Sequence, residues 1–130
     1  MIIRSENIII SGRVLKGEGL ANSTGYPTAN LSPALIKKHQ LKTGVYAAWG
    51  TIGQGRRRPA IVVVGSPNKR RRRGIKLEVY FLSLKKPIRG KTITVEIVKK
   101  IRPIYYYKSV APLLKHIKKD IIKAKKILHL

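Results

Sequence analysis

Apolar and polar residues alternate along two segments of the chain. Residues 75–84 and 91–101 both carry apolar side chains at alternate positions through most of their length. In the first segment these apolar residues are Ile75, Leu77, Val79 and Phe81. Because neighbouring side chains of a β-strand point to opposite faces, a period of two predicts strands. Apolar runs predict further strands within residues 7–16, 44–52 and 59–65.

Two other segments carry the signals of helices. Ser32 and Pro33 are the residue types favoured as N-cap and first helical residue, and they predict a short helix. Ser109 is the expected N-cap of a final helix, whose apolar residues recur at helical spacing. They are Leu113, Leu114, Ile117, Ile121, Ala124 and Leu128. At least five strands and a final helix, joined mostly by short turns, predict an antiparallel barrel closed by that helix.

The composition is that of one folded domain covering residues 1–130, since 43% of the residues are hydrophobic. The chain has no cysteine and three scattered histidines, which excludes disulfides and gives no pattern for a zinc site. No apolar stretch approaches the roughly 20 residues that a membrane helix needs. We therefore expect a cytoplasmic protein that acts as a monomer and has no membrane partner.

The charge is strongly positive. Lysine and arginine total 29 against five carboxylates, which gives a net charge of +24. Such a field attracts polyanions, among them nucleotides and nucleic acids, although general basicity explains it equally well. The scarcity of acids leaves a short set of candidate general bases besides the histidines. These carboxylates are Glu6, Glu18, Glu78, Glu96 and Asp120.

The segment GYPTANL, residues 25–31, carries candidate metal ligands. Pro27 stiffens the backbone, so Thr28 and Asn30, two residues apart in an extended chain, present their side chains on the same side. A hydroxyl and an amide oxygen suit Mg²⁺, which takes one or two protein ligands when phosphates supply others. The glycine-containing residues 17–25 precede them, and their backbone N–H groups could cradle phosphate oxygens. The alternative interpretation is that residues 25–31 form only a turn followed by a strand.

Taken in order, these segments resemble the riboflavin kinase family. The resemblance spans about residues 11–126 and is carried by GRVLKG at 12–17, GYPTANL at 25–31, GVY at 44–46, VGSP at 64–67, LEVY at 77–80, GK at 90–91, IRP at 101–103, and Tyr107, Ser109 and Asp120. It implies a mainly β protein, a six-stranded antiparallel Greek-key β-barrel with a C-terminal α-helix. It also implies Mg²⁺-dependent transfer of the γ-phosphoryl group of ATP to the 5′-hydroxyl of riboflavin, giving FMN and ADP.

The resemblance also assigns residues to this reaction. Glu78 falls on the catalytic glutamate, and Thr28 and Asn30 would contact Mg²⁺ and the phosphates. Nucleotide-binding residues would be Gly17, Gly19, Ala21, Gly25, Tyr26, Pro27, Thr28 and Asn30. Flavin-binding residues would be Arg102, Tyr105 and Tyr107. Because the predicted barrel begins close to Met1, we expect FMN as the final product, without FAD synthesis.

The residues themselves leave alternatives open for the two strand glutamates. Glu78 lies on the face opposite the apolar residues of its segment, and if that apolar face packs outward against the helix, Glu78 points into the barrel mouth. Alternatively, Glu78 is a solvated residue paired with Lys76. Glu96 has similar geometry on a neighbouring strand, where a surface ion pair is the simpler interpretation.

Two further alternatives concern the whole chain. The net charge, the basic run KRRRR at 69–73 and the tyrosines at 105–107 also suit an RNA-binding β-barrel. The tyrosines could equally anchor the final helix. The chain departs from the family pattern at Ala21, Asn22, Arg89 and Ile104, and these changes keep open a flavin-binding protein without turnover.

Overall fold

The computed structural model describes residues 7–15, 27–65, 75–84, 86, 88–107 and 109–130. Six strands form one antiparallel sheet in the order β1-β6-β3-β4-β5-β2. They are β1 (Ile8–Arg13), β2 (Thr28–Leu31), β3 (Gly44–Ile52), β4 (Arg58–Gly65), β5 (Lys76–Phe81) and β6 (Thr92–Arg102). The helices among the described residues are α2 (Ala34–Lys38) and α3 (Val110–Ile127). No helix in the described ranges is long and apolar enough to cross a membrane.

The strand order makes a Greek key that curls towards closure. β3, β4 and β5 follow one another as neighbours, and β6 returns to lie beside β3. The outer strands of the sheet approach each other where Leu15, just beyond β1, forms an isolated bridge with Asn30 of β2. The Leu15 N–H donates to the Asn30 carbonyl oxygen at 2.7 Å. The predicted mainly β barrel with six antiparallel strands and a C-terminal helix is confirmed.

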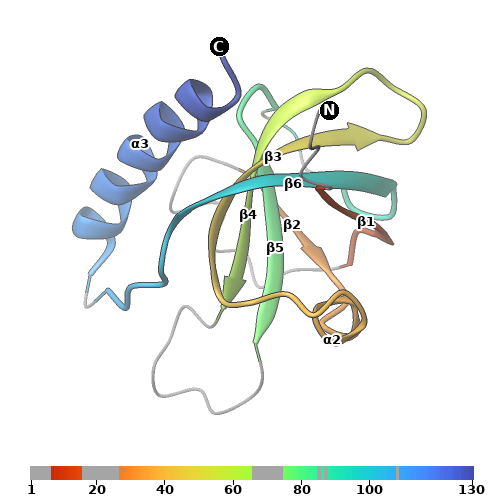
Figure 1. Ribbon diagram of the computed structural model, residues 1–130, viewed down its shortest axis with the longest axis horizontal. Coiled ribbons are helices and arrows are strands. Elements are labelled where there is room, and N and C mark those ends of the chain that lie inside the picture. Colours follow the sequence, from red (N-terminus) through yellow and green to blue (C-terminus); the bar gives the residue numbers. More distant parts are fainter. Residues whose placement is uncertain (1–6, 16–26, 66–74, 85, 87, 108) are drawn as a thin grey trace, which may run out of the picture.

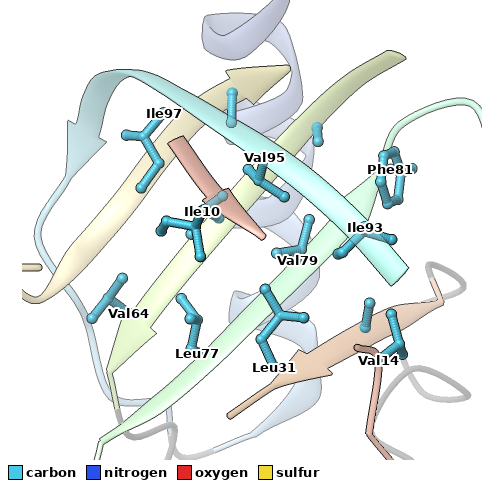
Figure 2. Close-up of a cluster of buried hydrophobic side chains, with 14 of the residues drawn as sticks. Ile10, Val14, Leu31, Val64, Leu77, Val79, Phe81, Ile93, Val95 and Ile97 are labelled. Atoms are coloured by element: carbon cyan, nitrogen blue, oxygen red, sulfur yellow. The ribbon is translucent and has the colours of Figure 1, made fainter. Parts of the chain in front are cut away.

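The inner face of the curved sheet holds the main core. Alternate residues of the strands point inward, and Figure 2 shows their side chains gathered between β1, β5 and β6. They include Ile10, Leu31, Val64, Leu77, Val79, Phe81, Ile93 and Val95, all almost fully buried. Leu35 and Ile36 of α2 pack against this cluster. Each such side chain contributes roughly 1.5–3 kcal/mol through its removal from water.

A second apolar layer lies on the outer face, beneath α3. Figure 1 shows α3 alongside the sheet, and it contacts β3, β4 and β6. Ala124 and Leu128 of α3 pack there on Val45, Ala47 and Ile61. The predicted apolar stripe of the final helix is therefore the face that covers the barrel.

The orientation of β5 corrects one expectation. We expected Glu78 to point into the barrel mouth if the apolar face of its strand packed outward against the helix. Instead, Leu77 and Val79 lie inside the barrel, so Glu78 projects from the outer surface. The barrel interior is filled by apolar side chains, among them Leu77 and Val79. Because Glu78 lies between these two residues in the strand, its half-buried carboxylate must lie on the outer face.

One of the two predicted N-caps agrees with the structure and the other does not. Pro33, not Ser32, is the N-cap of α2, although the Ser32 hydroxyl accepts a hydrogen bond from the Ala34 N–H at 3.3 Å. Ser109 is the N-cap of α3 as predicted, but its side chain makes no capping hydrogen bond. The packing of the apolar stripe, rather than the cap, holds α3 in place.

Candidate active site

The candidate site is built on the pair of strands β2 and β5. Their antiparallel register places Asn30 directly opposite Glu78, and Thr28 directly opposite Tyr80. Directly opposed residues have Cβ atoms about 4.5–5.5 Å apart, and diagonal neighbours such as Thr28 and Glu78 lie about 7–8 Å apart. The register alone thus brings a hydroxyl, an amide and a carboxylate into one small area.

All three side chains share the outer face of the sheet. The residues between and beside them, Ala29, Leu31, Leu77 and Val79, belong to the inner core. Since strand side chains alternate, Thr28, Asn30 and Glu78 must project outward, and each is half-buried. Glu78 also faces Val63 of β4, a member of the outer apolar layer. The site therefore lies beside the layer that α3 covers.

The backbone of β2 is held from both sides. β5 pairs with all four residues of β2, and Leu15 bonds to the Asn30 carbonyl from the other edge. Pro27 immediately precedes the strand, where its missing N–H costs no ladder hydrogen bond. The two candidate metal ligands are thus fixed on a rigid element, which favours precise positioning.

A second polar group links the end of β6 to α3. Asp120 is 2% exposed and receives two hydrogen bonds from Arg102, from Nε at 2.8 Å and from Nη2 at 2.9 Å. The remaining Arg102 nitrogen, Nη1, donates to the Pro103 carbonyl at 3.0 Å. Burial acts to lower the pKa of Arg102, but the bonds and charge of Asp120, with smaller effects of Tyr107 and Tyr80, raise it above its usual value. The guanidinium stays charged at every physiological pH.

The tyrosine run packs around this pair. The Arg102 guanidinium lies over the Tyr105 ring at 5.2 Å, and Tyr105 remains 46% exposed. Tyr105 and Tyr107 flank His116 of α3, with ring centroids at 5.3 and 5.2 Å. The Tyr107 hydroxyl also forms a hydrogen bond with His116 Nδ1. Burial raises the pKa of Tyr107. The helix-anchoring interpretation of these tyrosines is therefore supported for Tyr105 and Tyr107, and Tyr105 remains partly exposed.

One packing contact and one electrostatic effect connect the Arg102–Asp120 pair to the candidate site. A Cβ atom on Gly65 would lie 2.7 Å from Ile104, so Ile104 rests against the end of β4. Gly65 pairs with Lys76, two residues before Glu78 on the same face of β5. Tyr80, opposite Thr28, contributes to the pKa of Arg102. The segment after β6 therefore borders the outer surface that carries Glu78.

The structure separates Glu96 from this site. Glu96 accepts a hydrogen bond from Asn7 Nδ2 at 3.0 Å and lies 4.0 Å from Arg57 Nη1, in a partly exposed ion pair on the surface. The surface ion pair predicted for Glu96 is confirmed. Sequence reasoning missed Tyr80 and His116. Tyr80 shares the outer face of β5 with Glu78, so strand alternation could have identified it, whereas the contacts of His116 depend on how α3 docks.

Several predicted site residues lie outside the described residues. They are Gly17, Gly19, Ala21, Gly25 and Tyr26 of the expected nucleotide loop, together with the basic run at 69–73. Among the residues that are described, no group of three or more histidine, cysteine or acidic side chains gathers to hold a metal. The candidate ligands predicted from the sequence are the neutral oxygen atoms of Thr28 and Asn30, a donor set that fits a cation bound largely through phosphates and water.

Comparison with solved structures shows that a riboflavin kinase has the same fold. Riboflavin kinase from Trypanosoma brucei superposes with a TM-score of 0.72 over 96% of this chain and 82% of its own, at 22% identity. A family model for riboflavin kinase, Flavokinase, matches residues 4–128. The chain belongs to the riboflavin kinase family, which confirms the resemblance stated from its sequence.

Curated relatives carry the same family name. Human riboflavin kinase is 28% identical over 123 residues, which cover 92% of this chain and 79% of the human protein. The RNA-binding riboflavin kinase RibR of Bacillus subtilis is 33% identical over 113 residues, 87% of this chain. The match covers only 48% of the Bacillus protein, so this chain spans about half the length of that relative.

Proposed function

We propose that this protein is a Mg²⁺-dependent riboflavin kinase that transfers the γ-phosphoryl group of ATP to the 5′-hydroxyl of riboflavin, giving FMN and ADP. The observation that carries the proposal is the opposition of Asn30 and Glu78 across β2 and β5, with Thr28 on the same face. Family membership over residues 4–128 supports it. Phosphoryl transfer requires mainly positioning and neutralisation of charge, and this small polar area on a rigid sheet is suited to both.

The residues divide between the two substrates. The Thr28 hydroxyl and the Asn30 amide oxygen would hold Mg²⁺, with phosphate oxygens and water as its other ligands, and the bound ion would supply positive charge to offset that of the phosphates. Glu78 lies diagonal to Thr28, so it faces the incoming alcohol from the opposite strand. Its carboxylate accepts the proton of the 5′-hydroxyl as that oxygen bonds to phosphorus, and the bond to ADP breaks.

The flavin is proposed to lie along the segment after β6. Tyr105 offers a half-exposed ring on which an isoalloxazine can stack, and its other contacts, with Arg102 and His116, fix its position. Tyr107 and Arg102 border the same place. The nucleotide loop with Gly17, Gly19, Ala21, Gly25 and Tyr26 remains a prediction from the resemblance, as does Pro27 as a nucleotide contact.

A direct assay tests the proposal. Purified protein is incubated with riboflavin, ATP and Mg²⁺, and FMN and FAD are separated by chromatography. We expect FMN, and we expect Glu78→Gln to lower the rate by roughly 10²–10⁴-fold, the usual contribution of a general base. Glu96→Gln is the matched control, because it makes the same chemical change in an exposed ion pair. Flavin binding without turnover, or equal activity of both variants, would contradict the proposal.

A second candidate function is RNA binding. The name of the Bacillus relative describes that protein as RNA-binding, and its match covers 87% of this chain. The net charge of +24 favours association with a polyanion. The two functions are compatible, because the candidate kinase site occupies one small area of the barrel.

A further inference from the structure

The outer face of α3 is rich in lysine. Between residues 115 and 126, the side chains pointing away from the barrel are Lys115, Lys118, Lys119, Ile122, Lys123, Lys125 and Lys126, all exposed. Figure 1 shows this helix on the outside of the fold, with no other described element beyond it. At 1.5 Å per residue, the lysines extend over about 16 Å of helix. We call these six lysines the α3 lysine face.

No acid within the described part of the chain neutralises this face. The one acid in α3, Asp120, is buried on the opposite side and bound to Arg102. Glu96 is engaged by Asn7 and Arg57 on the sheet. The lysines therefore form no ion pair among the described residues, and their charges are available to a partner.

This arrangement opposes the stability of the helix. Lys115 and Lys119, and likewise Lys119 and Lys123, stand four residues apart, a spacing at which like charges destabilise a helix by about 0.2–0.5 kcal/mol per pair. Only Lys125 and Lys126, in the last turn, gain from the helix dipole. A cluster that weakens its own helix is expected where function requires the charge.

We propose that the α3 lysine face binds the phosphate backbone of double-stranded RNA. This deepens the second candidate function by naming its surface, and it rests on that function alone, not on the kinase activity. Lysine ammonium groups bind phosphates as point charges, and successive turns of one helix present them at regular intervals to a regularly charged strand. Binding of this kind is largely independent of sequence and strongly dependent on salt.

The composition of the face disfavours other partners. Ile122, 68% exposed, is the only exposed apolar residue between residues 115 and 126, whereas an interfacial membrane helix needs a broad apolar face. The apolar stripe of α3 is already used against the barrel. Protein interfaces are depleted in lysine and rely on aromatic and arginine anchors. Single-stranded RNA binds through stacking on aromatic rings, and the outer face of α3 offers none between these residues.

The test uses a labelled 20-base-pair RNA duplex of mixed sequence and two triple variants of equal charge. The α3 variant loses half of the α3 lysine face through Lys115→Gln, Lys119→Gln and Lys126→Gln. The control variant loses three exposed lysines in and after α2 through Lys37→Gln, Lys38→Gln and Lys42→Gln. Both variants lower the net charge from +24 to +21, so they change long-range attraction equally. Because the substitutions in α3 remove repulsion within the helix, the α3 variant should have the thermal unfolding temperature of the wild type or a higher one.

We expect the α3 variant to bind the duplex roughly tenfold more weakly than the wild type. The plot of the logarithm of the binding constant against the logarithm of salt concentration should also become shallower, its slope falling in magnitude by about 2, since each phosphate contact contributes roughly 0.7–0.9. The control should retain the wild-type slope, and both variants should retain kinase activity. Equal losses in the two variants, or none in either, would overturn the proposal. Tighter binding to the single strand than to the duplex would also overturn it. The same holds if the protein binds only phosphatidylserine vesicles and Ile122→Ser abolishes that binding.

Discussion

Asn30 and Glu78 face each other directly across the β2–β5 ladder, on the outer surface of a barrel whose interior is apolar. Forty-eight positions separate them in sequence, yet two rigid strands fix their relative position. Thr28 lies diagonal to Glu78 on the same face. A metal–phosphate group held, as proposed, by Thr28 and Asn30 would therefore lie beside a carboxylate that cannot itself reach into the barrel.

The first prediction concerns the metal. Asn30→Ala removes one proposed neutral oxygen ligand while leaving the backbone bond to Leu15 intact. We expect the Mg²⁺ concentration at half-maximal rate to rise about tenfold or more, in the range that follows loss of an orienting group at a metal site. Titration of FMN formation with Mg²⁺ measures it. Removal of Mg²⁺ by EDTA should abolish turnover in the wild type and in the variant.

A threonine on another strand supplies the control for the metal site. Thr94 of β6 also lies on an outer surface, where its hydroxyl forms a 2.8 Å hydrogen bond with Ser11. Thr28→Val should shift the Mg²⁺ titration in the same direction as Asn30→Ala, whereas Thr94→Val should leave it in place. A shift of equal size in both threonine variants would remove Thr28 from the metal site.

Much of the fold could be predicted because it depends on local periodicity. The strand predicted at residues 44–52 coincides with β3, and the stripe predicted for the final helix is the face of α3 that is buried against the sheet. The direction in which β5 presents Glu78 could not be obtained in this way. Alternation separates the two faces of a strand but does not say which one faces the core, because that depends on the other strands and on α3.

The site was predictable in part for the same reason. Thr28 and Asn30 share a face by strand alternation alone, but their alignment with Glu78 depends on the register of β2 and β5, which are separated by two other strands in the chain. The two bonds between Arg102 and Asp120 depend on the docking of α3. Such long-range relationships leave no periodic signal in a single sequence.

The second prediction concerns a close contact that the sequence does not reveal. A Cβ atom on Gly50 would lie 2.4 Å from Cε1 of the buried Phe81 ring. The ring cannot move away, since it is enclosed by the inner core, so Gly50→Ala should lower the free energy of unfolding by about 1–3 kcal/mol. Urea denaturation measures this change.

A second substitution tests the cause of that loss. Phe81→Leu removes the atoms that collide with the new methyl group. In a double-mutant cycle, Gly50→Ala should therefore cost distinctly less in the Phe81→Leu background than in the wild type. Strictly additive effects of the two substitutions would show that the contact with Phe81 is not the reason.

The third prediction concerns the buried pair that joins β6 to α3. The side chains of Arg102 and Asp120 are 12% and 3% exposed. Removing either charge therefore leaves the other without a partner and with little access to water. Arg102→Met or Asp120→Leu alone should lower the free energy of unfolding by about 3–5 kcal/mol, whereas the double replacement should restore most of it. Because Arg102 also supports the Tyr105 ring, the double variant should fold but show a raised KM for riboflavin with little change in kcat. Thermal unfolding measures the stability, and steady-state kinetics measure the KM for riboflavin. If the double variant regains stability and its KM is unchanged, the pair is purely structural. That outcome would also remove Arg102 and Tyr105 from the flavin side of the site.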